Sequence, residues 1–481
     1  MINKKSVLSN FIWRFFERTG AQLVTLVVSI VLARILEPKV YGTVAVVTVI
    51  ITILQVFVDG GFATALIQKK DADDIDFSTV FYFNLAMCIL LYILVFAFAP
   101  FISIFYGMKE LTSVIRVISL IIIISGIKNV QQAYVARNML FKRFFFATLG
   151  GTIGAAFLGI TLAYCGFGVW ALVLQMLFNT TVDTVILWIT VKWRPLAVFS
   201  FERLKGLFNF GWKILLANLV ATITGQLRQL VIGKQYSSED LAFYNRGRQF
   251  PELIVTNVNT SIDSVLLPTL SNNQDNLTVV REMTRKSIKV STYIMSPLLM
   301  GLFACADNVV NFILTDKWFF CIPFLRVFCI TFFFYPIHTA NLNAIKATGR
   351  SEVLLKLEFI KDSVSLLLIF VTMRFGTMVI AYGMMVSSVF SQIINSWPNR
   401  KILNYTYFQQ LIDLLPNAII AIIMGGIVWC INLFGFSSGI TLIIQIFLGA
   451  LIYLLLSMIT KNESFRYLVG IIIPLIFRRK C

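Results

Sequence analysis

The chain has few of the residues on which most enzymes depend for acid–base or metal chemistry. Its 481 residues contain a single histidine, His338, and only 13% of them are charged. Seven cysteines are scattered along the chain without the spacing of metal ligands. The sequence also lacks a glycine-rich phosphate loop, a His-Glu-x-x-His motif and a Ser/His/Asp grouping. These absences argue against a hydrolase or a nucleotide-hydrolysing pump, so we predict no enzymatic activity, no cofactor and no metal site.

Apolar residues are abundant instead. They make up 58% of the chain and the mean hydropathy is +0.83, more apolar surface than a soluble core needs. Hydrophobic stretches long enough to cross a hydrocarbon core of ~30 Å recur between short polar loops. We expect an all-α integral membrane protein with about fourteen transmembrane helices, near residues 13–35, 42–67, 79–105, 112–135, 145–165, 168–191, 208–232, 250–272, 291–314, 320–345, 354–374, 377–397, 411–433 and 438–459. The stretch 250–272 is half polar, so we expect it to face protein or water.

The first stretch carries charges where a membrane helix is usually apolar. If its helix starts near Trp13, Arg18 lies roughly 7 Å inside the membrane, and Arg14 and Glu17 precede it. These charges, and the lack of a small-residue cleavage site after the apolar run, argue against a cleaved signal peptide. We expect a permanent helix whose charged side chains either face a wet interior or reach back to the interface.

The net charge of +18 is distributed unevenly. With the N-terminus in the cytoplasm, the loops on that side and both termini hold about 25 Lys and Arg, and the opposite loops about 8. Such a bias orients membrane proteins, and it gives no support to a nucleic-acid partner. We therefore predict that both termini are cytoplasmic.

The first six stretches resemble the next six when the chain is shifted by about 200 residues. Matching positions keep their order, and they include Tyr41 with Tyr244, Asp59 with Asp263, Arg116 with Arg326, and Lys128 with His338. Because six is an even number, both copies would have the same orientation in the membrane. We predict two six-helix lobes, residues 1–198 and 199–405, followed by two helices and an interfacial tail in 406–481.

Several segments resemble those of a known family. They are ARILEPKVYGTVAVV (33–47), FVDGGFATALIQKK (57–70), GKQYSSEDLAFYNRGRQFPELI (233–254) and SVLLPTLSNNQDN (264–276). The pattern L-x-P-x-x-Y-G, formed by Leu36, Pro38, Tyr41 and Gly42, is typical of polysaccharide flippases of the Wzx type. These belong to the larger group of multidrug, oligosaccharidyl-lipid and polysaccharide exporters, and the resemblance covers the whole chain.

The resemblance implies a function and its partners. Two lobes would surround a central cavity through which undecaprenyl pyrophosphate-linked oligosaccharide moves from the cytoplasmic to the outer leaflet by alternating access. The protein would lie in the bacterial inner membrane and serve the synthesis of lipopolysaccharide O-antigen, capsule or exopolysaccharide. Its partners would be this lipid-linked oligosaccharide and membrane lipids, with a polysaccharide polymerase as a further candidate.

Basic residues inside the predicted helices are the candidate contacts for such a cargo. A pyrophosphate carries about two negative charges, and a cation facing lipid costs ~2.5–3.5 kcal/mol, so these residues would instead line a wet cavity. The candidates are Arg18, Lys128 and Arg228, followed by Lys213 and Arg14. Other roles remain open, because Arg14 can pair with Glu17, and Arg14, Arg18 and Lys213 can reach the cytoplasmic interface.

Acidic residues inside the predicted helices form a second group of candidates. Asp59 and Asp263 occupy matching positions of the two copies, so we predict that they bind a coupling ion. Alternatively, the two positions mark a break in each helix, which Gly60 and Gly61 would permit.

Two other functions fit parts of the sequence. A multidrug or organic-cation exporter of the same superfamily would need a smaller and more acidic cavity. A membrane glycosyltransferase or polymerase would need catalytic residues in a large extracytoplasmic loop, but the longest expected here, 234–249, has only about 16 residues. The family resemblance favours the flippase over both.

The predicted topology can be tested directly. Loops 68–78, 137–144, 192–207, 273–290, 346–353 and 398–410 should be cytoplasmic, because they carry most of the basic residues. Single cysteines placed in these loops, after replacement of the native cysteines, should resist a membrane-impermeant thiol reagent added to intact cells. Modification of any of the six would contradict the topology.

Overall fold

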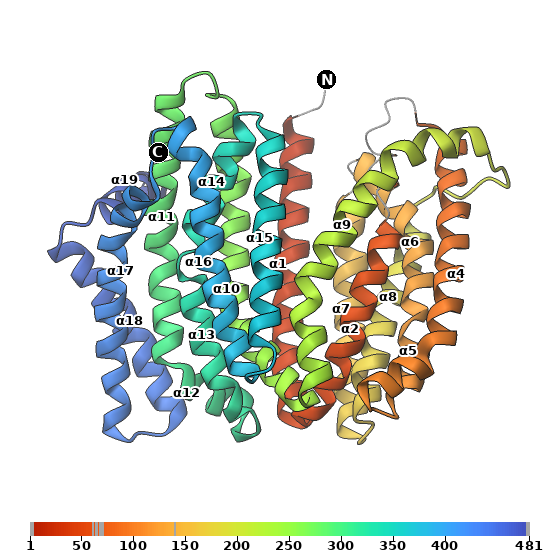
Figure 1. Cartoon of the computed structure of the whole chain (residues 1–481), viewed down its shortest axis with the longest axis horizontal. Coiled ribbons are helices and arrows are strands. Elements are labelled where there is room, and N and C mark those ends of the chain that lie inside the picture. The colour runs from red at the N-terminus through yellow and green to blue at the C-terminus, as the bar shows by residue number, and fades with distance from the viewer. Residues whose placement is uncertain (1–3, 60–61, 63–65, 67–71, 139–140, 478–481) are drawn as a thin grey trace. The chain divides into compact units, whose positions relative to one another are not determined.

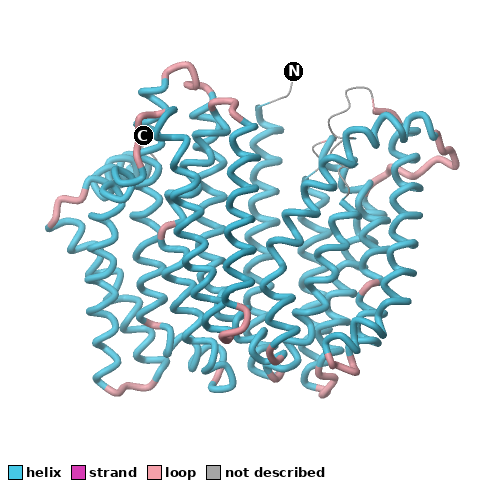
Figure 2. Tube along the Cα trace, in the orientation of Figure 1, coloured by secondary structure: helices cyan, strands magenta, loops and turns pink. Residues whose placement is uncertain are grey.

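A computed structural model describes residues 4–59, 62, 66, 72–138 and 141–477, although side chains are not described for 4–19, 141–142, 207, 209–211, 213–214, 351 and 471–477. The described residues form helices joined by short loops (Figures 1 and 2). The long helices are α1 (Lys4–Ile35), α2 (Pro38–Asp59), α4 (Asp74–Tyr106), α5 (Leu111–Ile118), α6 (Leu120–Arg137), α7 (Phe141–Tyr164), α8 (Val169–Thr190), α9 (Phe201–Gln235), α10 (Ser238–Ser271), α11 (Leu277–Ala304), α13 (Ile322–Phe333), α14 (Tyr335–Ala347), α15 (Ser351–Thr372), α16 (Thr377–Ile402), α17 (Tyr407–Cys430), α18 (Ser438–Ile459) and α19 (Glu463–Phe477). Short turns, α12 (Ala306–Val309), η1 (Val310–Leu314), η2 (Asp316–Cys321) and η3 (Ile431–Phe434), lie between some of them.

Local sequence explains where several helices begin and end. Asp73 caps α4 by accepting a hydrogen bond from the backbone N–H of Asp76, and the Asp76 side chain accepts one from the backbone of Asp73. The Asp76 N–H, followed by the Arg203 guanidinium, lowers the pKa of Asp73. α4 ends at Gly107, whose φ of 68° suits a residue without a side chain.

The L-x-P-x-x-Y-G segment marks a close contact between two helices. Pro38 is the first residue of α2, a position where its missing N–H costs nothing. At Gly42, a Cβ would lie 1.7 Å from the backbone oxygen of Ser238 at the start of α10. Only glycine therefore allows α2 to approach this turn so closely.

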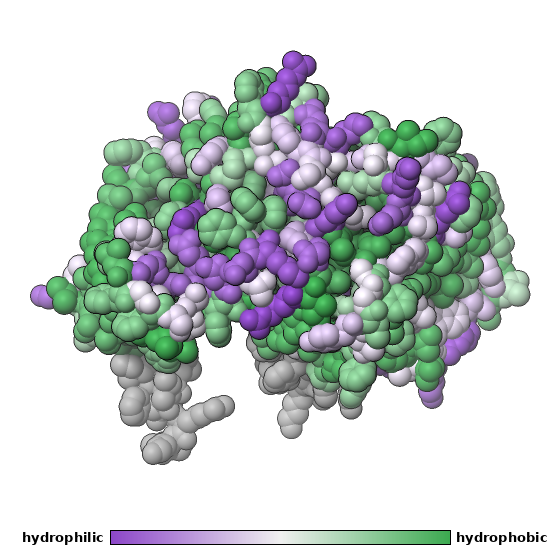
Figure 3. Space-filling model, turned by 90° about the horizontal axis from the view of Figure 1, so that it is seen from below, coloured by the Kyte–Doolittle hydropathy of each residue, from purple (hydrophilic) through white to green (hydrophobic). Residues whose placement is uncertain are grey.

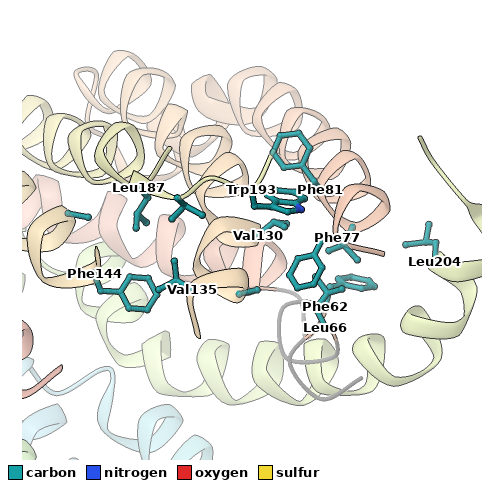
Figure 4. Packing of buried hydrophobic residues seen from close by; sticks show 14 residues of the cluster. Phe62, Leu66, Phe77, Phe81, Val130, Val135, Phe144, Leu187, Trp193 and Leu204 are labelled. Carbon is teal, nitrogen blue, oxygen red and sulfur yellow. The ribbon is translucent and has the colours of Figure 1, made fainter. Parts of the chain in front are cut away.

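The contacts divide the chain into two compact units, Met1–Ala242 and Phe243–Cys481. In the first unit, α7 packs against α1 and α8, and α6 packs against α2, α4 and α8. A buried cluster joins α4, α6, α7, α8 and the segment that follows α8, through residues that include Phe77, Phe81, Val130, Leu187 and Trp193 (Figure 4). Its rings meet at edges and faces, as buried aromatic side chains prefer.

In the second unit, α11 packs along α17, while α16 contacts α13, α14 and α15. A buried polar group ties this unit together. Arg285 of α11 donates two hydrogen bonds, of 2.7 and 2.8 Å, to the two carboxylate oxygens of Asp413 in α17. Tyr405 donates a third bond of 2.8 Å to the same carboxylate. The Asp413 side chain, only 4% exposed, therefore has partners for both of its oxygens.

The all-α membrane architecture expected from the sequence is confirmed. Each of the fourteen predicted stretches falls mainly on a described helix, and eleven helices or helix pairs are long and apolar enough to span a membrane. Over the residues described, three predicted stretches are not long and apolar enough by this test: 13–35, 250–272 and 354–374. The count of fourteen therefore stays a prediction. Large hydrophobic side chains are exposed along many helices, and Figure 3 shows them on one face of the molecule beside patches of hydrophilic residues. Lipid would cover such side chains in a membrane.

Some expected boundaries differ. α2 is described from Pro38 to Asp59, and most of the rest of the predicted stretch 42–67, including Gly60 and Gly61, lies outside the described residues. The loop expected at 234–249 is wrong, because α9 continues to Gln235 and α10 starts at Ser238. The predicted lobe boundary at 198/199 stays a prediction. The compact units instead divide inside α10, because α9 packs against α2 and α4.

The Asp413 contacts predict a measurable loss of stability. Asp413→Asn should reduce the free energy of unfolding by about 2 kcal/mol, less than the ~3–5 kcal/mol of a fully buried broken pair because Arg285 is 43% exposed. The matched control is Glu463→Gln. The Glu463 carboxylate forms an ion pair with Lys289 but is 79% exposed, so the effect of this substitution should be small. Thermal unfolding of the purified variants would compare them. Equal stability of the two variants would contradict this role of Asp413.

Candidate functional site

The first unit holds one of the predicted cations between three helices. Lys128 lies in α6, about nine residues or roughly 14 Å before the helix ends. Its ammonium group donates a 2.9 Å hydrogen bond to Oδ2 of Asp183 in α8. The two side chains are only 16% and 15% exposed, so this ion pair lies mostly inside the unit.

The neighbouring residue of α6 connects the pair to α2. Asn129 is buried, and its amide donates to the backbone oxygen of Val58 at 2.7 Å and to Asp59 Oδ1 at 3.3 Å. Lys128 also interacts electrostatically with Asp59, which is the more exposed of its two acidic neighbours. We call Lys128, Asp183, Asp59 and Asn129 the Lys128 cluster. It brings a predicted cargo contact and a predicted ion site together.

The second unit has a neutral pair at the place that matches Lys128 and Asp183. His338 of α14 and Asn395 of α16 form a 2.6 Å hydrogen bond between Nδ1 and Nδ2. Asn343 of α14 donates a 2.5 Å bond to Asp263 Oδ1 of α10. These are two separate polar pairs, each of which includes a residue of α14.

The Lys128–Asp183 and His338–Asn395 pairs are in register under the predicted repeat. Lys128 and Asp183 lie 210 and 212 positions before His338 and Asn395, an offset close to that of the sequence matches. Both units also contain an Asp on one helix that accepts a hydrogen bond from an Asn on another helix. An ion pair at one place in the first unit is thus replaced by a pair of neutral groups in the second.

The remaining predicted cations are less well defined. The side chains of Arg14, Arg18 and Lys213 lie outside the described residues. Arg228 is half-buried on α9, between Gln226 and Gln229, whose amides bond to each other at 2.6 Å. It lies on a different helix from the Lys128 cluster, so a cavity shared by Arg18, Lys128 and Arg228 stays a prediction.

Two arginines of α10, one buried and one half-buried, were not among the predicted site residues. The predicted helix starts at residue 250, which leaves both of them in a loop. Arg246 is 5% exposed, and its guanidinium lies 4.8 Å from the centre of the Trp318 ring. Arg248 pairs with Glu252 at 2.7 Å. The missed signal is Ser237, which accepts from the Asp240 N–H and whose own N–H bonds to Asp240, a capping box that starts the helix early.

The middle of α10 exposes a polar face. Its exposed side chains belong to Thr256, Asn257, Thr260, Ser261, Asp263 and Ser264. A row of hydroxyls, amides and a carboxylate on a helix among membrane helices is expensive against lipid. This face therefore suits water or a polar ligand, as the composition of 250–272 predicted.

A cavity of about 530 Å³ in the second unit has the opposite character. Apolar side chains of α11, α17 and α18 line most of it, including Leu298, Met424 and Leu442. Two polar side chains at its wall already have partners, since Gln445 donates to the Val428 oxygen and Tyr453 to the Tyr293 oxygen. The cavity suits a hydrocarbon group. Among the residues that the structure describes, no group of three His, Cys, Asp or Glu side chains could hold a metal ion.

Comparison with known proteins identifies the family. Residues 31–323 match the model of the family described as polysaccharide biosynthesis protein. The teichuronic acid biosynthesis protein TuaB of Bacillus subtilis is 27% identical over 84% of this chain and 85% of its own. The lipopolysaccharide biosynthesis protein WzxC of Escherichia coli is 24% identical over 82% of each chain.

Solved structures show the same fold at low sequence identity. The inward closed lipid II flippase MurJ aligns with a TM-score of 0.77 at 15% identity, covering 94% of this chain and 99% of that one. An inward-facing multidrug resistance transporter of the MATE family aligns with a TM-score of 0.64 at 16% identity, covering 80% and 94%. This is a multi-pass membrane protein with the helical fold of these transporters, and the resemblance found in its sequence is confirmed: the chain belongs to the polysaccharide biosynthesis protein family.

Proposed function

We propose that the protein is a flippase for undecaprenyl pyrophosphate-linked oligosaccharide. It would move these units from the cytoplasmic to the outer leaflet of the bacterial inner membrane by alternating access, for O-antigen, capsule or exopolysaccharide synthesis. The observation that carries the proposal is the mostly buried ammonium group of Lys128, set between α2, α6 and α8 in a member of this family. Both termini would be cytoplasmic, and a polymerase would take the cargo on the outer side.

The chemistry of the cargo explains why the interior is polar. Neither a pyrophosphate nor a sugar chain crosses hydrocarbon unaided, because both would lose their hydrogen bonds with water. Lys128, with Arg18, Arg228 and Lys213 as further candidates, would replace the hydration of the phosphates. The hydroxyls and amides on the polar face of α10 would bond sugar hydroxyls.

A multidrug exporter is the alternative, since that family shares the fold. Organic cations would require acidic groups without partners. The acids of the Lys128 cluster instead surround a lysine, and Asp263 already accepts a bond from Asn343. The polysaccharide-related names of the curated relatives also favour the flippase.

Neutralising the cations should stop transport of the cargo. Replacing Arg18, Lys128 and Arg228 together by Gln should reduce flipping by roughly tenfold or more, since each charge-assisted hydrogen bond is worth ~1.5–3 kcal/mol. Lipid-linked oligosaccharide should accumulate on the cytoplasmic leaflet. In spheroplasts, a smaller fraction of it should then be accessible to probes added from outside. Exchange between Lys and Arg should be tolerated better, though incompletely.

Arg14→Gln is the control for this experiment. Its nearest expected partner is Glu17, so the loss of either should act on protein abundance and the two losses should not add. Normal surface polysaccharide in the triple Gln variant, at matched abundance, would rule out a cationic path for the cargo.

The acids at matching positions should reveal whether transport is coupled to an ion. If Asp59 or Asp263 binds a coupling proton, its replacement by Asn should abolish gradient-driven transport while abundance is kept. The Asn side chain can still accept from Asn129 or Asn343, which preserves the described hydrogen bonds. Unchanged transport in both variants and in the double variant would leave the two acids with a structural role.

A further inference from the structure

Packing α6 against α8 does not by itself require an ion pair between Lys128 and Asp183. At the matching place in the second unit, the neutral His338 and Asn395 join α14 to α16 through one hydrogen bond of 2.6 Å. A neutral pair therefore suffices to connect such helices. A buried ion pair is the costlier choice, because both charges must leave water. The charges in the first unit need another explanation.

The environment of Asp183 leaves its carboxylate only partly satisfied. Oδ2 accepts from Lys128, whereas Oδ1 is buried and has no hydrogen-bond partner. α7 packs closely against this part of α8, because a Cβ at Gly151 would lie 2.9 Å from Asn179 Oδ1 and 3.4 Å from the Asp183 backbone nitrogen. A carboxylate held by one bond is easier to separate from its partner than one held by several.

The surroundings of the Lys128 ammonium group differ from those of the Asp183 carboxylate. The Lys128 side chain is 16% exposed, it pairs with the mostly buried Asp183, and it interacts electrostatically with the exposed Asp59, so its ammonium group is not sealed inside the unit. Its stem has four rotatable bonds and its charge is a point charge, so it can exchange one anion for another without a fixed geometry.

We infer that Asp183 is an internal counter-ion of Lys128 that competes with the anionic group of the cargo and so limits how tightly the cargo is held. In the empty protein, Asp183 neutralises Lys128, which avoids the cost of a bare cation among membrane helices. When the pyrophosphate arrives, Lys128 binds it and leaves Asp183. Return of Lys128 to Asp183 then assists release. Asp183 is thus a positioning residue, and this inference rests on the proposed function.

Competition of this kind has a consequence that simple packing does not. Removing the competitor should strengthen binding and slow turnover, because a transporter that holds its cargo too tightly releases it slowly. A purely structural acid would instead weaken folding, binding or both when neutralised.

The experiment compares variants in lipid nanodiscs with farnesyl pyrophosphate as the probe of the anionic group, and with lipid-linked oligosaccharide for turnover. Asp183→Asn should bind the probe roughly tenfold more tightly than the wild type, equal to ~1.4 kcal/mol, and flip the natural cargo more slowly. Asp307→Asn is the matched control, since it removes the same charge from another pair, Asp307 with Arg326 at 2.7 Å. Its affinity for the probe should equal that of the wild type.

A second variant carries the neutral pair of the other unit into the first. Lys128→His combined with Asp183→Asn should fold, because His338 and Asn395 form such a pair, but it should lose the gain in affinity. Asp183→Ser, which also lacks the charge, replaces Asp183→Asn if that variant does not fold.

Each result decides between the possibilities. If the wild type binds the probe and neither neutral variant at 183 binds it more tightly, the counter-ion role is wrong while the flippase proposal stands. If the double variant binds as tightly as Asp183→Asn, Lys128 is not the contact and the inference also fails. If the folded wild type does not bind the probe, the cationic contact in the proposed function fails first.

Discussion

The cost of leaving a polar group without a partner in hydrocarbon constrains every part of this molecule. Helices satisfy the backbone, so the described chain is helical wherever it would meet lipid. Side chains must then find partners on other helices. Arg285 with Asp413, Lys128 with Asp183, and Asn343 with Asp263 are solutions of this kind. Each pair removes a desolvation cost and fixes which two helices are neighbours.

The two copies of the predicted repeat satisfy their polar groups differently at one matching place, with an ion pair in the first and a neutral pair in the second. A neutral pair joins two helices at little electrostatic cost, whereas an ion pair also contains a charge for which an anionic ligand can compete. The first unit holds the Lys128 cation, which under the proposed function binds the phosphates, and the second holds the polar face of α10, which offers hydroxyls and amides. A cargo that combines phosphate and sugar needs both kinds of group.

The helix α10 shows how capping and burial together overrule hydropathy. Its composition is too polar for a membrane span, yet Ser237 and Asp240 start a helix that runs from Ser238 to Ser271. This early start moves Arg246 and Arg248 from an expected loop into the packed interior, where Trp318 and Glu252 compensate their charges. A hydropathy profile could not identify these two arginines as part of a packed helix, because it scores each charged residue without its partner.

The sequence by itself determined the class of the protein, its helical stretches and its family, because long apolar runs, their spacing and the L-x-P-x-x-Y-G segment are local properties of the chain. It also singled out Lys128, Asp59 and Asp263. Only the tertiary structure decided that Lys128 pairs with Asp183, 55 residues away, and that Asn129 and Asn343 hold the two matching acids. Such partners come from different helices, and their distance depends on packing that no periodicity encodes. Whether a charge in a membrane helix anchors, pairs or binds is therefore a property of the fold, not of the residue.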